Sequence, residues 1–259
     1  MKSFGRISPG GPRILRDECR VFRGRRQNST RRPRDVREGW YIKWRLHKHI
    51  TITDAMPAPI IHPAQFTSKI VEASGRVLLL LDTQHCVLAS VNQGGIPDVK
   101  AARCNIENIL STARKAQIPP LIVHMRNTGD PGDMDEPGTP GWQLIYPPLP
   151  NELVIDKRKN NAFAGTNLGE IIPTSAEIIV VGFQTDFSIR ATCSAALGRG
   201  NEVLLVHGAH KTYPRIEVLH GGGVTSAEQV EFEIEAELTE AGVHVLDMED
   251  VGHIFDSRE

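Results

Sequence analysis

Wholly apolar segments of strand length alternate with longer amphipathic segments along residues 76–248. The expected strands lie at 76–82, 119–126, 151–157, 176–183, 201–209 and 243–248. The expected helices lie at 98–117, 189–200 and 225–242. Strands that are apolar throughout are buried on both faces, and helices between successive strands are typical of parallel pairing. The alternation therefore predicts an α/β fold of three layers, in which a doubly wound, mostly parallel sheet of about six strands carries helices on both faces.

Local signals place the ends of two of these helices. Thr225 and Glu228 match a capping box, in which a hydroxyl and a carboxylate satisfy free N–H groups of the first turn. We therefore expect Thr225 to begin the last helix. Gly200 follows a helix of small residues, where a left-handed glycine commonly ends a helix.

Charge divides the chain into two parts. Residues 1–54 carry 15 lysines and arginines against 5 acids, whereas the rest of the chain carries 15 against 26. The first part has little apolar periodicity, so it cannot bury enough surface to offset the entropy lost on ordering. We predict that residues 1–55 are a basic extension without stable structure, and that a globular domain covers residues 56–259. Three roles stay open for the extension: a passive extension, a targeting segment, or a nonspecific polyanion-binding tail.

Several classes of protein have no support in the sequence. No apolar run approaches the roughly 20 residues of a membrane span, and no dinucleotide-binding, phosphate-binding or paired metal-ligand motif occurs. The four cysteines, Cys19, Cys86, Cys104 and Cys193, match neither a metal knuckle nor a dense disulfide framework. We therefore expect free thiols, no cofactor, no membrane contact and a cytoplasmic location, with a mitochondrial address as the alternative raised by the N-terminal arginines.

Three chemically active side chains stand where predicted strands end. Asp82 follows the first strand, Lys157 closes the third, and Ser188 follows the fourth at the start of a helix. The carboxyl ends of parallel strands share one edge of the sheet, where ligands of such folds bind. Each residue also has an ordinary explanation, as a helix cap, an exposed lysine or a small filler. If they converge, a desolvated carboxylate, a cation and a hydroxyl would meet in one crevice.

Three segments, taken in order, resemble the isochorismatase-like hydrolase superfamily. They are "LLLLDTQ" (78–84), "VIDKRKNNAFAGTNL" (154–168) and "VVGFQTDFSIRATCSAALGRGNEVLLV" (180–206). The superfamily includes nicotinamidases, ureidoacrylate hydrolases and isochorismatases, and the resemblance assigns residues 56–259 to such a hydrolase domain. It implies a catalytic set of Asp82, Lys157 and, where its hydrolases place a nucleophilic cysteine, Ser188. Cys193 lies five residues further on and is expected in the core, while Cys86 stays open as a substitute nucleophile.

The resemblance implies further features of the site. One is a cis peptide bond between Phe183 and Gln184. The substrate pocket is expected to involve Gln84, Trp142, Phe163, Gln184 and Thr185, under a covering loop at 127–150. The histidine pair of the nicotinamidase metal site is missing, so no metal is expected. The partners implied are a small-molecule substrate and further copies of the chain in a dimer or tetramer, with no specific nucleic acid.

The implied reaction is hydrolysis of a C–N amide or ureido bond. Thr185 and Asp186 favour this amidase-type branch. A serine hydroxyl is a much weaker acid than a thiol, whose pKa is about 8.5. We therefore expect the activity to be weak or lost. Two alternatives stay open: a catalytically inactive homologue that binds a small molecule or a partner, and a vinyl-ether hydrolase in which the aspartate acts as an acid and no nucleophile is needed.

Overall fold

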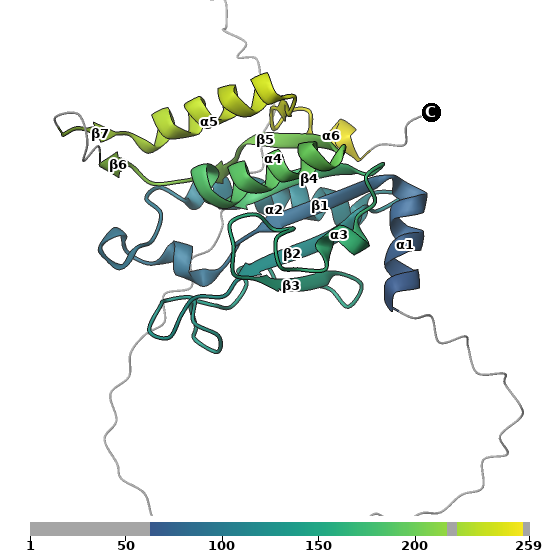
Figure 1. Cartoon of the computed structure of the whole chain (residues 1–259), viewed down its shortest axis with the longest axis horizontal. Coiled ribbons are helices and arrows are strands. Elements are labelled where there is room, and N and C mark those ends of the chain that lie inside the picture. The colour runs from purple at the N-terminus through teal and green to yellow at the C-terminus, as the bar shows by residue number, and fades with distance from the viewer. Residues whose placement is uncertain (1–62, 217–221, 256–259) are drawn as a thin grey trace, which may run out of the picture. The chain divides into compact units, whose positions relative to one another are not determined.

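A parallel sheet of six strands forms the middle layer of the structure (Figure 1). The structure is a computed structural model that describes residues 63–216 and 222–255. The strands are β1 (Arg76–Leu81), β2 (Leu121–Asn127), β3 (Leu153–Lys157), β4 (Glu177–Phe183), β5 (Glu202–Lys211) and β8 (His244–Leu246). Their order across the sheet is β3-β2-β1-β4-β5-β8, with every pairing parallel. The predicted fold class is therefore confirmed. The predicted extension 1–55 lies outside the described residues.

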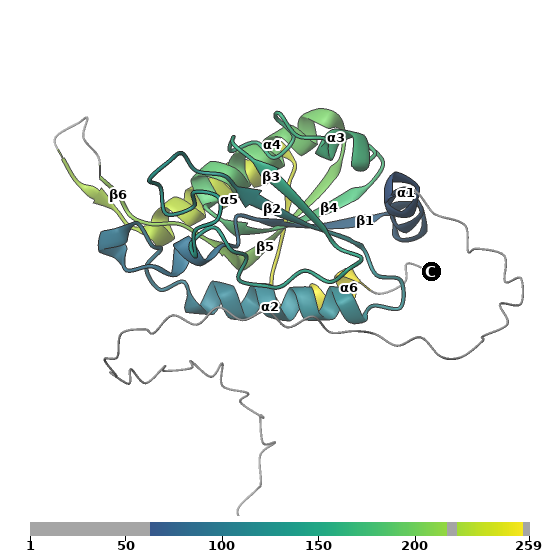
Figure 2. The ribbon, with the colours of Figure 1, turned by 90° about the horizontal axis from the view of Figure 1, so that it is seen from below.

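Helices cover both faces of this sheet, as Figure 2 shows. One face carries α2 (Lys100–Lys115) and α6 (Val251–Ile254). The other carries α1 (Pro63–Ser74), α3 (Leu168–Ile171), α4 (Arg190–Arg199) and α5 (Ala227–Ala241). No helix within the described ranges has the length and apolar composition to cross a membrane.

The packing of the central strand β1 explains why its sequence is an uninterrupted apolar run. Leu79 and Leu81 pack into the core beneath α4 and α5, whereas Leu78 and Leu80 pack into the core beneath α2. All four leucine side chains are fully buried. Because alternate residues of a strand point to opposite faces, a strand covered on both sides needs apolar residues at every position. The sheet order reverses beside β1, between its neighbours β2 and β4, and this switch point is where ligands bind in such folds.

Short elements depart from the expected pattern. The structure adds α1, α3, α6, two 3₁₀ turns η1 (His85–Leu88) and η2 (Val91–Gln93), and a small antiparallel pair of β6 (Arg215–Ile216) and β7 (Val224–Thr225). The prediction that Thr225 caps the last helix is wrong by one residue, and the helix itself begins at Ala227. Thr225 ends β7, and the side chain of Ser226 caps α5 by accepting a hydrogen bond from the N–H of Gln229. The expected end of α4 at Gly200, with φ of 94°, is confirmed.

Gly182 allows β4 to approach β1 closely beside the site. Its φ is 125°, and a Cβ atom at this position would lie 2.1 Å from the carbonyl oxygen of Leu81. The peptide bond between Phe183 and Gln184, one residue further along, is cis as predicted. Asp82, which follows Leu81, has a φ of 50°, a left-handed conformation that is uncommon outside glycine. Close contact between the two strands therefore fixes where Asp82 leaves the sheet.

We predict that Gly182→Ala lowers the free energy of unfolding by about 3 kcal/mol or more, because the methyl group would overlap backbone atoms of a buried strand. The measurement is denaturant unfolding followed by circular dichroism. The matched control is Gly198→Ala on the exposed side of α4, where a Cβ meets nothing within 4 Å. That substitution should be neutral or stabilise the protein by up to about 1 kcal/mol, because alanine favours helix. Equal effects of the two substitutions would contradict the close-contact role of Gly182.

Candidate active site

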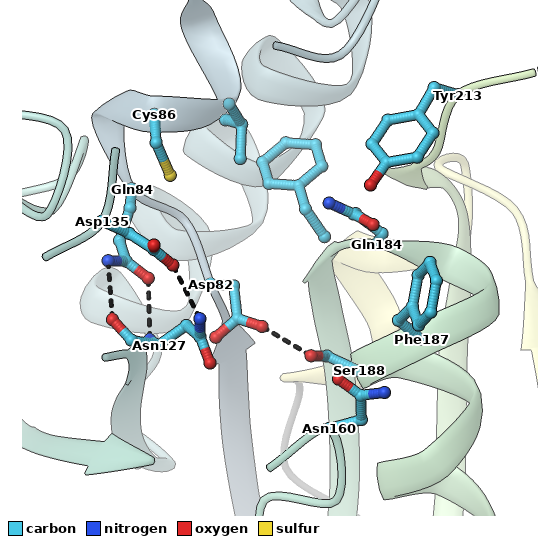
Figure 3. Close-up of a pocket in the computed structure, with 12 residues that line it drawn as sticks. Asp82, Gln84, Cys86, Asn127, Asp135, Asn160, Gln184, Phe187, Ser188 and Tyr213 are labelled. Carbon is cyan, nitrogen blue, oxygen red and sulfur yellow. Dashed lines mark hydrogen bonds between the residues drawn. The ribbon is translucent and has the colours of Figure 1, made fainter. Parts of the chain in front are cut away.

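Three strand ends bring Asp82, Lys157 and Ser188 into direct contact. The Lys157 ammonium donates hydrogen bonds to Asp82 Oδ2 at 2.8 Å and to Ser188 Oγ at 3.0 Å. The Ser188 hydroxyl donates to the same Asp82 oxygen at 2.5 Å (Figure 3). Asp82 follows β1, Lys157 is the last residue of β3, and Ser188 precedes α4. The sheet therefore joins into one constellation three residues that lie far apart in the sequence.

Burial sets the electrostatics of this constellation. The Lys157 side chain is 0% exposed and that of Asp82 only 15%. Burial raises the pKa of the Asp82 carboxyl above its ordinary value of 3.8, and the nearby Lys157 charge opposes this shift without cancelling it. Asp82 Oδ1 is buried and has no hydrogen-bond partner among the described residues. Asp82 is therefore a stronger proton acceptor than an ordinary aspartate, and one of its oxygens is unused.

A π-helical turn, η3 (Thr185–Ile189), presents Ser188 to the site. The turn runs directly into α4, so the buried hydroxyl of Ser188 lies near the positive end of a helix. Asp186 anchors the turn by accepting a 2.7 Å hydrogen bond from Thr212 Oγ1 and by pairing with Arg215. The position of Ser188 therefore depends on contacts with the segment that follows β5.

A cavity of about 280 Å³ opens above the three residues. Twelve residues line it: Asp82, Gln84, Cys86, Val87, Asn127, Asp135, Asn160, Phe183, Gln184, Phe187, Ser188 and Tyr213. In Figure 3, Gln84, Asn127 and Asp135 lie on one side of Asp82 and Ser188, while Gln184, Phe187 and Tyr213 lie on the other. The volume is near the lower end of the roughly 300–1,000 Å³ typical of ligand pockets, so it suits a small molecule.

The residues predicted to shape the pocket divide into two groups. Gln84 and Gln184 line the cavity, whereas Trp142, Phe163 and Thr185 do not. The Trp142 ring lies under the Arg126 guanidinium at 3.4 Å, and the Phe163 ring lies under that of Arg199 at 4.6 Å. Thr185 is buried beneath the turn, with its hydroxyl 3.0 Å from Nδ1 of His210.

Other lining residues were not singled out from the sequence. Asn127 and Asp135 belong to the predicted covering loop, and Tyr213 follows β5. Asn160 comes three residues after Lys157, within a polar segment whose composition resembles that of any exposed loop. Its place directly after the lysine strand, within the segment 154–168 that resembles the superfamily, could have identified it.

Neither cysteine near the site is suited to act as the nucleophile in place of Ser188. Cys86 lines the cavity, but burial, followed by the negative charges of Asp135 and Asp82, raises the pKa of its thiol to about 12. Cys193 is fully buried in the core under α4, and burial raises its pKa to about 12. A thiol with such a pKa is almost entirely protonated near neutral pH and is a poor nucleophile. Within the described ranges no group of three or more histidine, cysteine or acidic side chains is arranged to hold a metal ion.

Similarity to known proteins agrees with this architecture. The family model of the isochorismatase domain matches residues 76–229. This match covers more than half of the chain, and the chain belongs to the isochorismatase family.

Two curated relatives are streptothricin hydrolases of Streptomyces noursei. One is 38% identical over 143 residues, covering 53% of this chain and 55% of the relative. The other is 34% identical over 142 residues, covering 53% and 50%. The chain thus spans about half the length of these curated relatives. Among solved structures, an isochorismatase from Pseudomonas putida KT2440 superposes with a TM-score of 0.60 at 28% identity, covering 69% of this chain and 90% of that one.

We predict strong coupling between Asp82 and Lys157 in the free energy of unfolding. Lys157→Met alone should cost about 3–5 kcal/mol, because it leaves a buried carboxylate without its cation. Combining it with Asp82→Asn should cost less than the sum of the single substitutions by roughly 2 kcal/mol or more. Denaturant unfolding of the four proteins in the cycle measures the coupling.

The control for this cycle is the exposed pair of Arg158 and Asp130, whose side chains are 65% and 82% exposed. Substituting both should give a coupling of at most about 0.5 kcal/mol. Additive effects at Asp82 and Lys157, like those at the surface pair, would show that the buried contact does not link the two residues energetically.

Proposed function

We propose that the chain hydrolyses a C–N amide or ureido bond of a small molecule, with Ser188 as the nucleophile. The supporting observation is the position of the Ser188 hydroxyl, which donates to Asp82 and accepts from Lys157 at the base of the cavity. A nucleophile in contact with a base, itself held by a third group, is the arrangement that covalent hydrolysis requires. The relatives named streptothricin hydrolases support the hydrolase class.

The reaction follows from these contacts. Asp82 takes the hydroxyl proton as Ser188 Oγ bonds to the substrate carbonyl carbon. The Lys157 ammonium lies 3.0 Å from Ser188 Oγ and stabilises the negative charge that develops on this oxygen as its proton leaves. Asp82 then gives the proton to the departing nitrogen as the C–N bond breaks, which leaves an ester on Ser188. Asp82 next takes a proton from water as the water oxygen attacks the ester carbon. It returns this proton to Ser188 Oγ as the ester C–O bond breaks, which releases the acid and restores the serine.

The cavity also offers groups that suit an amide or a urea. The side chains of Asn160 and Gln184 both line it, and neither side chain makes a hydrogen bond within the described part of the chain. Each side-chain amide carries a donor and an acceptor. A planar amide or ureido group needs such a mixture, whereas a carboxylate would need donors alone.

We predict that Ser188→Cys raises kcat/KM for amide hydrolysis by roughly 100-fold or more. The thiol loses its proton more readily than the hydroxyl, and it would occupy the same place beside Asp82 and Lys157. The measurement is product release from a panel of small amides and ureas by the wild type and the variant.

Two further variants complete this test. Ser188→Ala should abolish the activity, and Ser194→Cys on the exposed side of α4 should leave it unchanged. Activity in the cysteine variant alone would indicate a homologue that binds small molecules and has lost catalysis. No hydrolysis by either protein over a wide panel would refute the amidase proposal.

A second candidate is vinyl-ether cleavage with Asp82 as a general acid. The observation in its favour is the raised pKa of Asp82, together with the unpaired Oδ1 atom. A carboxyl that keeps its proton to higher pH can donate it to a substrate carbon without any nucleophile. Under this alternative, hydrolysis of isochorismate would survive Ser188→Ala and be lost in Asp82→Asn.

The pH dependence of kcat/KM separates the two candidates. As a base, Asp82 must be ionised, so amide hydrolysis should increase as pH rises through the pKa of Asp82. Because burial raises this pKa, the increase should occur above the ordinary value of 3.8. As an acid, Asp82 must be protonated, so vinyl-ether hydrolysis should decrease over the same interval. Rates measured in overlapping buffers decide the sign, and an amide hydrolysis rate that falls over this interval would contradict Asp82 as the base.

A further inference from the structure

We propose that the substrate carries an ammonium or guanidinium group, which binds to Asp135 on one side of the cavity while its C–N bond reaches Ser188. This inference rests on the proposed C–N hydrolysis and adds the class of substrate to it. The carboxylate of Asp135 is the feature of the cavity that the reaction leaves unused.

Charge in the cavity is unbalanced. Asp82 and Asp135 are the charged residues among the twelve that line it. Lys157 matches the charge of Asp82 from beneath. Asp135 accepts a 2.6 Å hydrogen bond from the neutral Asn127 amide, and it forms no ion pair with the residues described at 63–216 and 222–255. A carboxylate beside a small cavity favours a bound cation and disfavours a bound anion.

The carboxylate is held in place rather than left free on the loop. Gln84 is fully buried, and its side-chain amide both accepts from the N–H of Asn127 at 2.7 Å and donates to the carbonyl of Asn127 at 3.0 Å. Asn127 in turn holds Asp135, whose own carbonyl accepts from the N–H of Gly129 at 3.0 Å. A Cβ atom on Gly129 would lie 2.2 Å from Asp135 Oδ1, so glycine leaves the space that the carboxylate occupies. Such fixed placement is what a recognition group requires.

The charge of Asp135 extends across the cavity. It contributes to the raised pKa of both Asp82 and Cys86, after the larger effect of burial. On the other side lie the rings of Phe187 and Tyr213 (Figure 3). The cation of Arg215, which stacks on both rings, is matched by its pairing with Asp186. A substrate cation in the cavity therefore meets one carboxylate that has no cationic partner among the described residues. The aromatic rings bound the other side of the cavity.

The test uses pairs of amides that differ in one charge. The probes are ω-aminoalkanamides of two to six carbons, alkanamides of matched length that end in a methyl group, and monoamides of dicarboxylic acids. The variant is Asp135→Asn, which keeps the shape and an acceptor for Asn127 while removing the charge. The matched control is Asp133→Asn, an exposed residue of the same loop outside the cavity lining.

We expect wild-type kcat/KM for the best aminoamide to exceed that of the matched alkanamide by about tenfold or more, as one charged contact would give. Asp135→Asn should reduce this ratio to about one while changing the alkanamide value by less than about twofold. Asp133→Asn should keep the wild-type ratio. Added salt should raise KM for the aminoamide and leave that of the alkanamide unchanged. A wild-type ratio near one, or an equal loss for both substrates in Asp135→Asn, would overturn the proposal.

Calorimetric titration with the aminoamides keeps the two proposals separate. Hydrolysis without preference for a cation would remove the Asp135 subsite and keep the C–N reaction. Binding that depends on Asp135 but leads to no hydrolysis would keep the subsite and remove the reaction. If no aminoamide is hydrolysed, and binding is absent or the same in the wild type and Asp135→Asn, the subsite proposal is refuted.

Discussion

The buried ammonium of Lys157 is the constraint on which the site depends. A charge with no exposed surface is unfavourable unless nearby groups replace its water shell, and here Asp82 and Ser188 do so at 2.8 Å and 3.0 Å. Because the three residues come from β1, β3 and the turn after β4, this compensation requires the sheet to be assembled. The charge of Lys157 is therefore compensated only when the sheet has formed, so the site depends on the fold.

The fold could be predicted from the sequence because the patterns that mark its main strands and helices each lie within one short stretch of the chain. Each central strand is an apolar run, and the strands alternate with helices long enough to show a period. The missed elements are short, and in β6 and β7 the two residues Ile216 and Val224 are 75% and 70% exposed, so no burial pattern marks them. The error at Thr225 also arose because the short strand β7 could not be recognised from the sequence. Thr225 and Ser226 are both suitable caps, and the pairing of Thr225 with Arg215 decides between them.

The site could be predicted where strand ends define it, and not where loops do. Asp82, Lys157 and Ser188 come together because parallel strands end at one edge. Gln84 and Gln184 line the cavity because they lie within three residues of strand ends. The aromatic residues were harder to place, because Arg126 and Arg199 stack on Trp142 and Phe163 outside the cavity lining. No single sequence window shows such pairings between distant segments.

The residues that support Ser188 matter because this is the position at which the family resemblance implies a nucleophilic cysteine. Asp82 keeps its left-handed backbone, Gly182 keeps a contact that no other residue would permit, and Lys157 keeps its buried charge. Each of these features is unfavourable by itself and persists only where the surroundings enforce it. Gly182 and Lys157 also contribute to the stability of the fold, so a homologue used for binding alone would need them as well. The comparison of Ser188 with a cysteine at the same position, rather than the surrounding support, therefore distinguishes the proposed chemistry from a purely binding role.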